Sequence, residues 1–442
     1  MTNTPINKKK ISEYNIEDLK EFFYNLSRKI SSRIILLEIS SEFFNIAVAK
    51  SKKNELKITN VFRQDLPKEA IEKSIPTDPN SFSDLLLNVI KELKLGGQRV
   101  AISLSSDTSY TRLIDIPVNI KEENSKDYLE DPDAGVQIPI SLNNSDFDIN
   151  LTNLPEKKIE NKFYKRYFLT SIPKKTVNTI LEIVAKSNLE LCSIQMSHMC
   201  LGNLLKPEID KLNDNELLIS IDLLDEFTQL IIFDNSGPIF IKRLASIKKF
   251  PTIDEIKEIK NREKDENNKS SKKLSSDYHP LSKLDLKILI KEISNSYEKF
   301  LNENNLSKKG KLFLSGRNSQ HENLVEILGH NLSMDVFLIS PIGIPKLREF
   351  DYDPDKINQF SMSRLIGLGL SLIRETKMNE EVLRSNNFII NKFTSIPSDT
   401  SSTKKETIKK TNNLPPLPDL GIKKKEDNQE KFRMDTTFLD DD

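Results

Sequence analysis

Cysteine is scarce in this sequence, with only two residues among 442. Cys192 and Cys200 are too few for a disulfide framework, which fits a protein of a reducing cytosol. They flank His198, but no fourth ligand lies nearby and no Cys-x-x-Cys pair occurs, so the spacing predicts no metal site. We expect both cysteines to be small, buried side chains.

An excess of one charge is also missing, because lysine plus arginine and aspartate plus glutamate each count 66. This balance argues against a globally basic surface for nucleic acid. Long hydrophobic runs are absent too: the most apolar stretches, 34–39 and 365–373, fall far below the roughly 20 residues that a membrane span requires. The charged N-terminus is followed by no apolar segment and is not predicted to be a signal peptide.

Two segments with the same pattern stand about 180 residues apart, at 33–63 and 217–243. Each predicts an apolar strand that ends in a carboxylate, Glu38 or Asp222, followed by a turn, a second strand, another turn and a third strand. The repetition predicts two homologous lobes that face each other. Actin-like ATPases hold a nucleotide in this way, in the cleft between their lobes.

The rest of the chain divides around this repeat. We predict an N-terminal extension (1–32) with an amphipathic helix at 15–30, and a first lobe (33–205) with an inserted α/β subdomain at about 98–188. A second lobe follows at 206–376 and ends in a helix at about 354–376. Segments at about 254–280 and at 377–442 are rich in Lys, Ser, Asn or Pro and are predicted to be disordered.

The predicted turns carry most of a nucleotide site but not all of it. In an actin-type cleft each turn reads Asp-x-Gly, where the Asp holds Mg²⁺ through water and the glycine lets backbone N–H groups approach phosphate. Here Ser40 and Leu224 replace the glycines, and acidic Asp225 and Glu226 follow the second carboxylate. A glycine turn near Gly316 resembles the adenosine contact. The candidate nucleotide-binding residues are Glu38, Ser40, Ser41, Asp222, Asp225, Ser315 and Gly316.

These turns leave two interpretations open. In the first, Glu38 and Asp222 position Mg-ATP, the only cofactor to which the sequence points. In the second, the two carboxylates cap hairpin turns and the cleft is the degenerate remnant of a nucleotide site. The bulk of Leu224 and the acids beside it favour the second interpretation, because they repel a triphosphate. No catalytic residue is assigned, and the sequence favours a scaffold with an ATPase-type fold over an active enzyme.

The order of elements resembles the PilM family, the cytoplasmic actin-like component of type IV pilus assembly machines, which is related in fold to the division protein FtsA. The resemblance covers about 33–376. It rests on ILLEISSEFFNIAVAK, RVAISLSSDTSYTRLIDIP, QIPISLNNSDFDINL, the LISIDLLDEFTQLIIFDNSGPIFIKR hairpins, LFLSGRNSQHENLVEILGHNLSMDVFLISPIG and RLIGLGLSLIR. It implies a two-lobed α/β actin-like fold with RNase H-like lobes.

The resemblance also implies a partner. The family binds the N-terminal cytoplasmic peptide of the inner-membrane protein PilN, in a groove between the first lobe and the inserted subdomain. On this chain the implied groove residues are Val100, Ile102, Leu104, Leu113, Ile114 and Ile116. Contacts with other pilus assembly proteins and self-association are further expectations. The implied location is cytoplasmic, at the inner membrane through the partner. The alternatives are an active Mg-ATP-binding ATPase and an FtsA-like filament protein.

Overall fold

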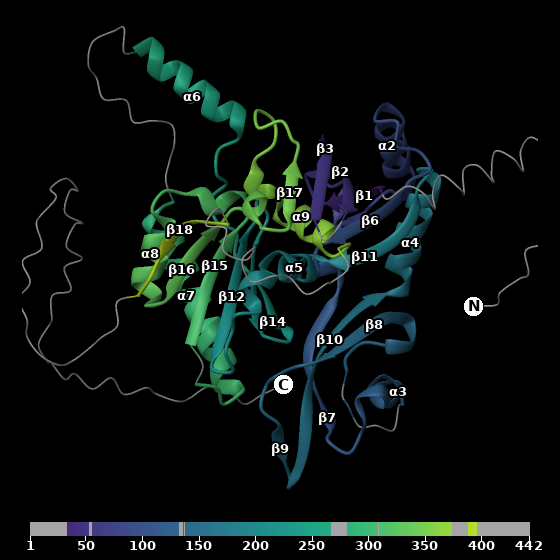
Figure 1. The fold of residues 1–442 in the computed structure, drawn as a ribbon, viewed down its shortest axis with the longest axis vertical. Helices are drawn as coiled ribbons and strands as arrows, with labels where there is room; N and C mark the ends of the chain where they lie inside the picture. Colours follow the sequence, from purple (N-terminus) through teal and green to yellow (C-terminus); the bar gives the residue numbers. More distant parts are fainter. Residues whose placement is uncertain are drawn as a thin grey trace, which may run out of the picture. The chain divides into compact units, whose positions relative to one another are not determined.

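The computed structural model describes residues 33–52, 55–131, 136, 138–266, 281–307, 309–373 and 388–395 (Figure 1). All of them belong to one unit, residues 1–395, by their contacts. The helix predicted at 15–30 and the tail beyond residue 395 lie outside the described residues. Among the helices that are described, none is long and apolar enough to cross a membrane.

The first repeated segment builds one half of a six-stranded sheet with the order β11-β6-β1-β2-β3-β17. The strands β1, β2 and β3 form the antiparallel meander, and β6 runs parallel to β1. Helices cover both faces, which explains why β1 reads as a nearly continuous apolar run. The strands are β1 (Arg33–Ile39), β2 (Phe43–Lys52), β3 (Glu55–Asp65), β6 (Arg99–Leu104), β11 (Glu190–Met196) and β17 (Leu347–Phe350).

The second repeated segment builds an equivalent sheet with the order β14-β13-β12-β15-β16-β18. Its meander is again followed by a strand parallel to its first strand, as β15 pairs with β12. Both sheets therefore bear out the predicted repetition. The strands are β12 (Glu216–Leu223), β13 (Thr228–Asp234), β14 (Gly237–Leu244), β15 (Lys309–Ser315), β16 (Asp335–Ile339) and β18 (Ile389–Phe393).

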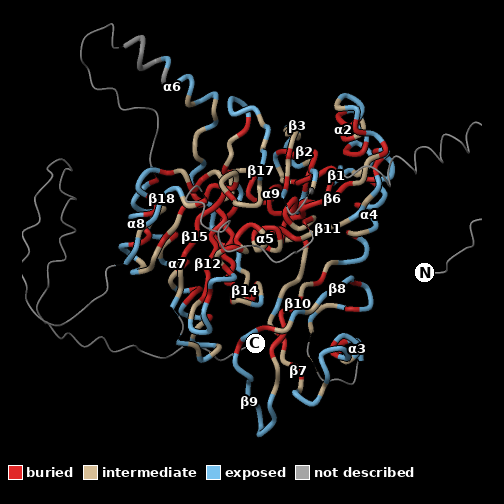
Figure 2. Tube along the Cα trace, viewed as in Figure 1, coloured by how far each residue is buried: buried red, intermediate tan, exposed pale blue. Residues whose placement is uncertain are grey.

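Helices fill the space between the sheets and cover their outer faces. The largest core is shared by both sheets and by α5 (Ser197–Ile209) and α9 (Ser363–Leu370), as the buried band in Figure 2 shows. Gly367 lets these helices touch, because a Cβ there would lie 2.0 Å from the Cys200 carbonyl oxygen. Outer faces are covered by α2 (Pro79–Glu92), α4 (Lys174–Lys186), α7 (Lys283–Glu303) and α8 (Leu324–Leu332).

The inserted subdomain is a smaller sheet with the order β7-β10-β8, and β9 pairs with the start of β10. It has its own apolar core, to which Leu129 of α3 (Ser125–Glu130) contributes. It is narrower than the predicted 98–188, because β6 belongs to the first sheet and α4 packs on that sheet's core. Its strands are β7 (Tyr110–Pro117), β8 (Ser145–Leu151), β9 (Lys157–Ile159) and β10 (Lys162–Pro173).

Two segments predicted to be disordered hold regular structure. Residues 253–266 form α6 (Ile253–Glu266), which begins with a capping box: Thr252 and Glu255 bond each other's backbone N–H groups at 2.6 and 3.3 Å. In the predicted tail, β18 pairs antiparallel with β16. The predicted final helix is also shorter, because the Asn358 side chain accepts a bond from the Phe360 N–H and starts a separate 3₁₀ turn.

Candidate functional site

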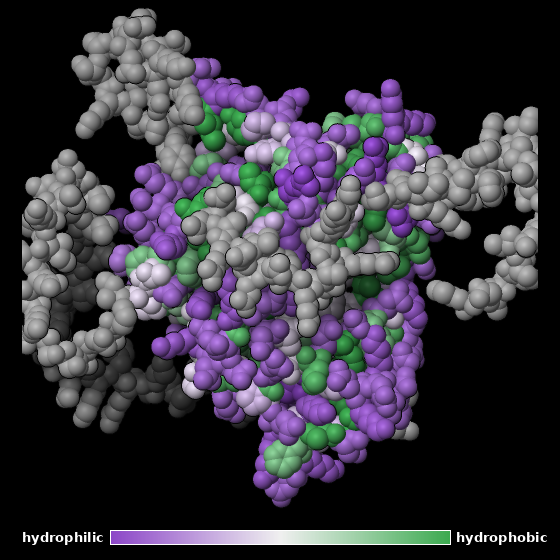
Figure 3. Space-filling model, in the orientation of Figure 1, coloured by the Kyte–Doolittle hydropathy of each residue, from purple (hydrophilic) through white to green (hydrophobic). Residues whose placement is uncertain are grey.

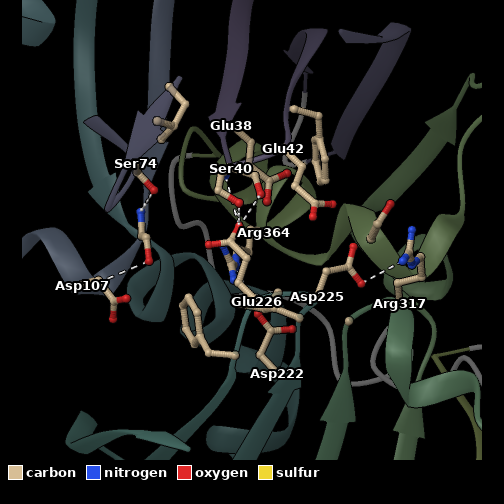
Figure 4. A pocket seen from close by; sticks show the side chains of 18 of the residues that line it. Glu38, Ser40, Glu42, Ser74, Asp107, Asp222, Asp225, Glu226, Arg317 and Arg364 are labelled. Carbon is tan, nitrogen blue, oxygen red and sulfur yellow. Dashed lines mark hydrogen bonds and ion pairs between the residues drawn. The ribbon is translucent and has the colours of Figure 1, made fainter. Parts of the chain in front are cut away.

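The candidate site is the cleft at the carboxyl ends of β1, β12 and β15, where three turns surround a cavity of about 280 Å³ (Figure 4). The strands β12 and β15 are parallel neighbours and end at the same edge of one sheet, and the turn after β1 reaches them from the other sheet through Glu226. The cavity is lined by six of the seven predicted nucleotide residues, Glu38, Ser40, Ser41, Asp222, Asp225 and Gly316. The seventh, Ser315, donates a hydrogen bond to Asp222 at 2.8 Å.

Asp222 holds an arginine that the sequence analysis missed. Arg364, on α9, donates from Nε to the Asp222 carboxylate at 3.0 Å, and both side chains are buried. Burial lowers the pKa of Arg364, but Asp222 and Glu38 raise it more, and the net shift is upward. Arg364 is therefore a permanent positive charge in the position between the two carboxylates that Figure 4 shows. A single arginine inside the apolar RLIGLGL helix was the signal available in the sequence.

Glu38 is the more isolated of the two carboxylates. It is buried at the end of β1 and accepts a hydrogen bond of 3.1 Å from the Asn45 amide. Burial raises its pKa, Arg364 and Asn45 lower it, and Asp222 adds a further upward contribution, so that the net shift is upward. One guanidinium cation thus serves both carboxylates: it bonds Asp222 and acts on Glu38 through its charge.

The donors of the first turn are taken by a carboxylate from the opposite lobe. Glu226 Oε1 accepts from the Ser41 backbone N–H at 3.1 Å and from the Ser40 hydroxyl at 3.3 Å, and it also contacts the Ser41 hydroxyl. These are the donors that would face a phosphate in an actin-type cleft. The sequence marked Glu226 only as an acid beside the second turn and not as their partner.

The second turn folds onto the glycine turn after β15. Arg317 pairs with Asp225 at 2.9 Å, and the Asn318 amide donates to the Leu224 carbonyl at 2.8 Å. Gly316 adopts a φ of 86°, and a Cβ there would lie 2.4 Å from the Leu223 carbonyl oxygen, so no other residue fits this approach. The second turn and the glycine turn therefore contact each other closely at the edge of the cavity.

Charges across the cleft join the lobes further. Arg243 pairs with Asp107 at 2.6 Å, and Lys249 pairs with Glu42. The cavity lining holds three more carboxylates than cations. The carboxylates are Glu38, Glu42, Glu72, Asp107, Asp222, Asp225 and Glu226, and the cations are Lys73, Arg243, Arg317 and Arg364. This excess of negative charge is unfavourable for a polyphosphate.

A second hollow, of about 560 Å³, lies between the inserted sheet and the first sheet. We call it the groove. Its walls come from β8 and β11, each of which borders one strand only in the described sheets, and from β10, α4 and α5. It is lined by Asp146, Phe147, Asp148, Asn150, Thr170, Ile172, Val177, Leu191, Cys192, Ser193, Ile194, Gln195, Met196 and Met199.

The residues predicted for a partner groove lie elsewhere. Val100, Ile102 and Leu104 are buried in the core of the first sheet, because β6 is an inner strand with both faces covered. Ile114 and Ile116 belong to the core of the inserted sheet, and Leu113 packs on the second sheet's core. None of the six lines either of the two hollows: three lie on β6, an inner strand, and three lie on β7, an edge strand of the inserted sheet whose side chains pack into neighbouring cores.

Polar side chains beneath the groove are buried and bonded to one another. His198 accepts or donates at Nδ1 with the Ser106 hydroxyl at 2.9 Å, and its Nε2 lies 3.5 Å from the Thr170 hydroxyl of the groove. Burial lowers the pKa of His198 to about 3, so the ring is neutral at pH 7. Cys200 is buried as predicted. Cys192, which was predicted to be buried, is exposed; it lies where the pairing of β11 with β6 shifts register between Leu191 and Ser193.

The two meander sheets, the helices between them and the cleft define an actin-like ATPase fold. The family model of the type IV pilus assembly protein PilM matches residues 37–375. The chain belongs to this family.

Solved structures share the fold at low identity. A chain of a PilM-PilN type IV pilus biogenesis complex matches with a TM-score of 0.54 and 15% identity, over 77% of this chain and 99% of that chain. The ethanolamine utilization protein EutJ from Carboxydothermus hydrogenoformans has a TM-score of 0.38 and 9% identity, over 77% and 90%. MreB5 of Spiroplasma citri bound to ADP has a TM-score of 0.34 and 9% identity, over 76% and 95%. No curated protein matches the sequence.

Proposed function

We propose that this protein is a cytoplasmic scaffold of type IV pilus assembly whose groove holds the N-terminal cytoplasmic peptide of a PilN-like inner-membrane protein. The observation that carries the proposal is the groove itself, bounded by two edge strands. Family membership and the likeness to a chain of a PilM-PilN complex support the choice of partner. Bound to this peptide, the scaffold is held at the membrane through its partner.

The groove has the chemistry of an extended-peptide site. Edge strands present backbone N–H and C=O groups that can pair with an added strand, and alternate side chains of the peptide then enter pockets. The apolar lining, with Ile172, Ile194 and Met196, suits such side chains. Asp146 on β8 favours a peptide with a basic residue, whereas Asp148 already pairs with Lys126 at 2.7 Å.

Calorimetry with a synthetic peptide tests this proposal, using the N-terminal cytoplasmic segment of the PilN-like protein of the same organism. Ser193→Arg places a long side chain in the groove without removing a core residue, and we expect the dissociation constant to rise about tenfold or more, which is about 1.4 kcal/mol. Ser193→Ala is the matched control and should bind like the unaltered protein. A peptide that binds the unaltered protein and Ser193→Arg equally well does not use this groove.

We also propose that the cleft does not hold Mg-ATP. The residues do not fit the ligand, because Arg364 already supplies the positive charge beside Asp222 and would repel Mg²⁺. Glu226 already accepts from the first turn, and its carboxylate would face the triphosphate. Both features support a degenerate cleft over an active ATPase.

Calorimetry with Mg-ATP separates these alternatives. We expect no heat of binding at nucleotide concentrations up to the millimolar range, and no phosphate release. Tight binding that is lost in Asp222→Asn would establish the ATPase instead. The peptide experiment does not depend on this result, because the groove and the cleft share no lining residue within the described part of the chain.

A further inference from the structure

One end of the inserted sheet exposes large apolar side chains. There β9 and the start of β10 form a hairpin that extends beyond β8, next to the end of β7 (Figure 1). Phe163 is 53% exposed and Val118 is 37% exposed, both on one face, whereas Ile159, also 37% exposed, pairs with Lys162 and lies on the other face. Apolar side chains gather over this end in the space-filling view, with hydrophilic residues around them (Figure 3). We call this set the hairpin tip.

The exposure has a structural origin. On β10, alternate residues from Tyr167 towards Phe163 share one face, and Tyr167 is buried in the core of the inserted sheet. On β7 the same face carries Ile116, which is also buried, and then Val118. On β7 the apolar row therefore continues past the end of its core to Val118, while on β10 Lys165 separates Phe163 from Tyr167. A stripe without a cover is unfavourable in water, which points to an external surface that covers it.

The charges of the hairpin tip on this face are positive. Phe163 pairs across the strands with Lys158, whose ammonium group lies 5.8 Å from the ring centroid, and with Val118 on its other side. Lys165 follows on the same face of β10. The nearest carboxylates along the hairpin are Glu160, in the turn where the chain reverses, and Glu156. Neither of them is among the residues that pair across the strands on the face of Phe163.

We propose that the hairpin tip binds the anionic surface of a lipid bilayer. Phe163 and Val118 enter the interface, and Lys158 and Lys165 lie at the level of the headgroups, where aromatic and basic side chains are favourable. A protein partner fits less well, because a stable interface buries roughly 800 Å² on each side and the tip offers only a few apolar side chains. Apolar contact and basic charge together are sufficient for reversible adsorption to anionic lipid.

This inference goes beyond the proposed function, which places the protein at the membrane only through a partner peptide. It does not rest on the peptide, because the tip residues and the groove lining have no residue in common within the described chain. A direct lipid contact adds a second, weak attachment. When one attachment is made, it raises the effective concentration for the other, so the overall affinity for the membrane exceeds that of either attachment alone.

Vesicle flotation with the full chain and no peptide tests the inference. We expect binding to vesicles of phosphatidylglycerol and phosphatidylcholine, and none to phosphatidylcholine alone. Phe163→Ser should lower the partition coefficient of the protein between vesicles and solution about fivefold or more, because it removes the apolar contact. Lys158→Glu combined with Lys165→Glu should lower it about tenfold or more, with a loss that shrinks at high salt.

Matched variants at distant exposed positions are the controls. Leu181→Ser on α4, where the side chain is 44% exposed, should leave vesicle binding unchanged, as should Lys68→Glu combined with Lys91→Glu. Circular dichroism and the melting temperature report whether each variant is folded. Absence of binding by the unaltered protein overturns the inference. The inference is also overturned if Phe163→Ser and the double lysine variant both bind vesicles as strongly as the unaltered protein. Another segment then makes the lipid contact.

Discussion

The cleft between the lobes and the groove beside the inserted sheet differ in what their polar groups contact. In the cleft, Asp222 is bonded by Arg364, and the donors around Ser41 are bonded by Glu226. In the groove, two strands at the edges of their sheets face a hollow of about 560 Å³, twice the volume of the cleft. In the hollow that the repeat marks as a ligand site, the polar groups that would contact a ligand are therefore already bonded to other side chains. We infer that the partner peptide binds in the groove and not in the cleft.

The largest expected effect comes from breaking the cleft's central ion pair. Asp222→Ala leaves the Arg364 guanidinium buried without its carboxylate, and we expect the free energy of unfolding to fall by about 3–5 kcal/mol. Chemical denaturation measures this loss. The double variant Asp222→Ala with Arg364→Met should recover most of the stability, because an apolar side chain replaces the unpaired charge. If the single and the double variant lose the same free energy of unfolding, the loss does not come from leaving the Arg364 charge unpaired.

A smaller effect follows from acidification, through the buried His198 beneath the groove. Its pKa is lowered to about 3 in the folded protein, so between pH 6.5 and that value the unfolded chain binds a proton that the folded chain does not. Stability therefore falls as the pH falls, by about 2 kcal/mol at pH 5. His198→Gln should flatten this dependence in denaturation curves recorded at several pH values. An unchanged slope in the variant would assign the acid sensitivity to other groups.

Glu38 in the cleft titrates in the opposite sense, which sharpens the comparison. Its pKa is raised by burial, so the folded protein holds the proton more tightly than the unfolded chain. This contribution is fully present below the ordinary glutamate pKa of about 4.5 and is lost as the pH rises through the raised value. Glu38→Gln should remove it, seen as a smaller loss of stability between mildly acidic and neutral pH. A steeper loss in the variant would contradict a raised pKa of the buried Glu38 carboxyl.

The smallest expected effect concerns the contact between the lobes at the first turn. Glu226→Gln replaces a charged acceptor by a neutral one at an exposed position, and we expect a stability loss below about 1 kcal/mol. The local effect is larger, since the Ser41 amide should exchange its hydrogen several times faster. Glu92→Gln, exposed on α2, is the control and should change neither quantity. Slower exchange at Ser41 would show that Glu226 does not protect this turn.

Much of the architecture could be predicted from local sequence patterns. The strand-turn-strand repeat placed β1 and β12 and their terminal carboxylates correctly, because an apolar run of strand length between turn residues is a local signal. The helix α6 was missed although Thr252 and Glu255 have capping-box spacing, because the charged composition of the segment outweighed that signal.

The lining of the two hollows could not be predicted in the same way. The predicted residues of β6 are apolar and strand-forming, as core residues and pocket residues both are, and only the strand order separates β6 from β11. That order places β6 inside the first sheet and β11 at its edge. Strand order depends on pairings between distant segments, which leave no periodicity in either segment alone.

The sequence alone determined the repeated meanders, the two lobes and the convergence of Glu38 and Asp222 at one cleft. These features could be predicted because burial patterns and strand ends depend on short, local stretches of sequence. Tertiary structure alone decided what those carboxylates meet. Arg364 stands 142 positions from Asp222, and Glu226 stands 185 positions from Ser41. Whether such side chains neutralise a site or leave it ready for a ligand depends on how helix α9 and the second turn pack across the cleft. Packing between remote elements is a property of the whole fold and not of any one segment.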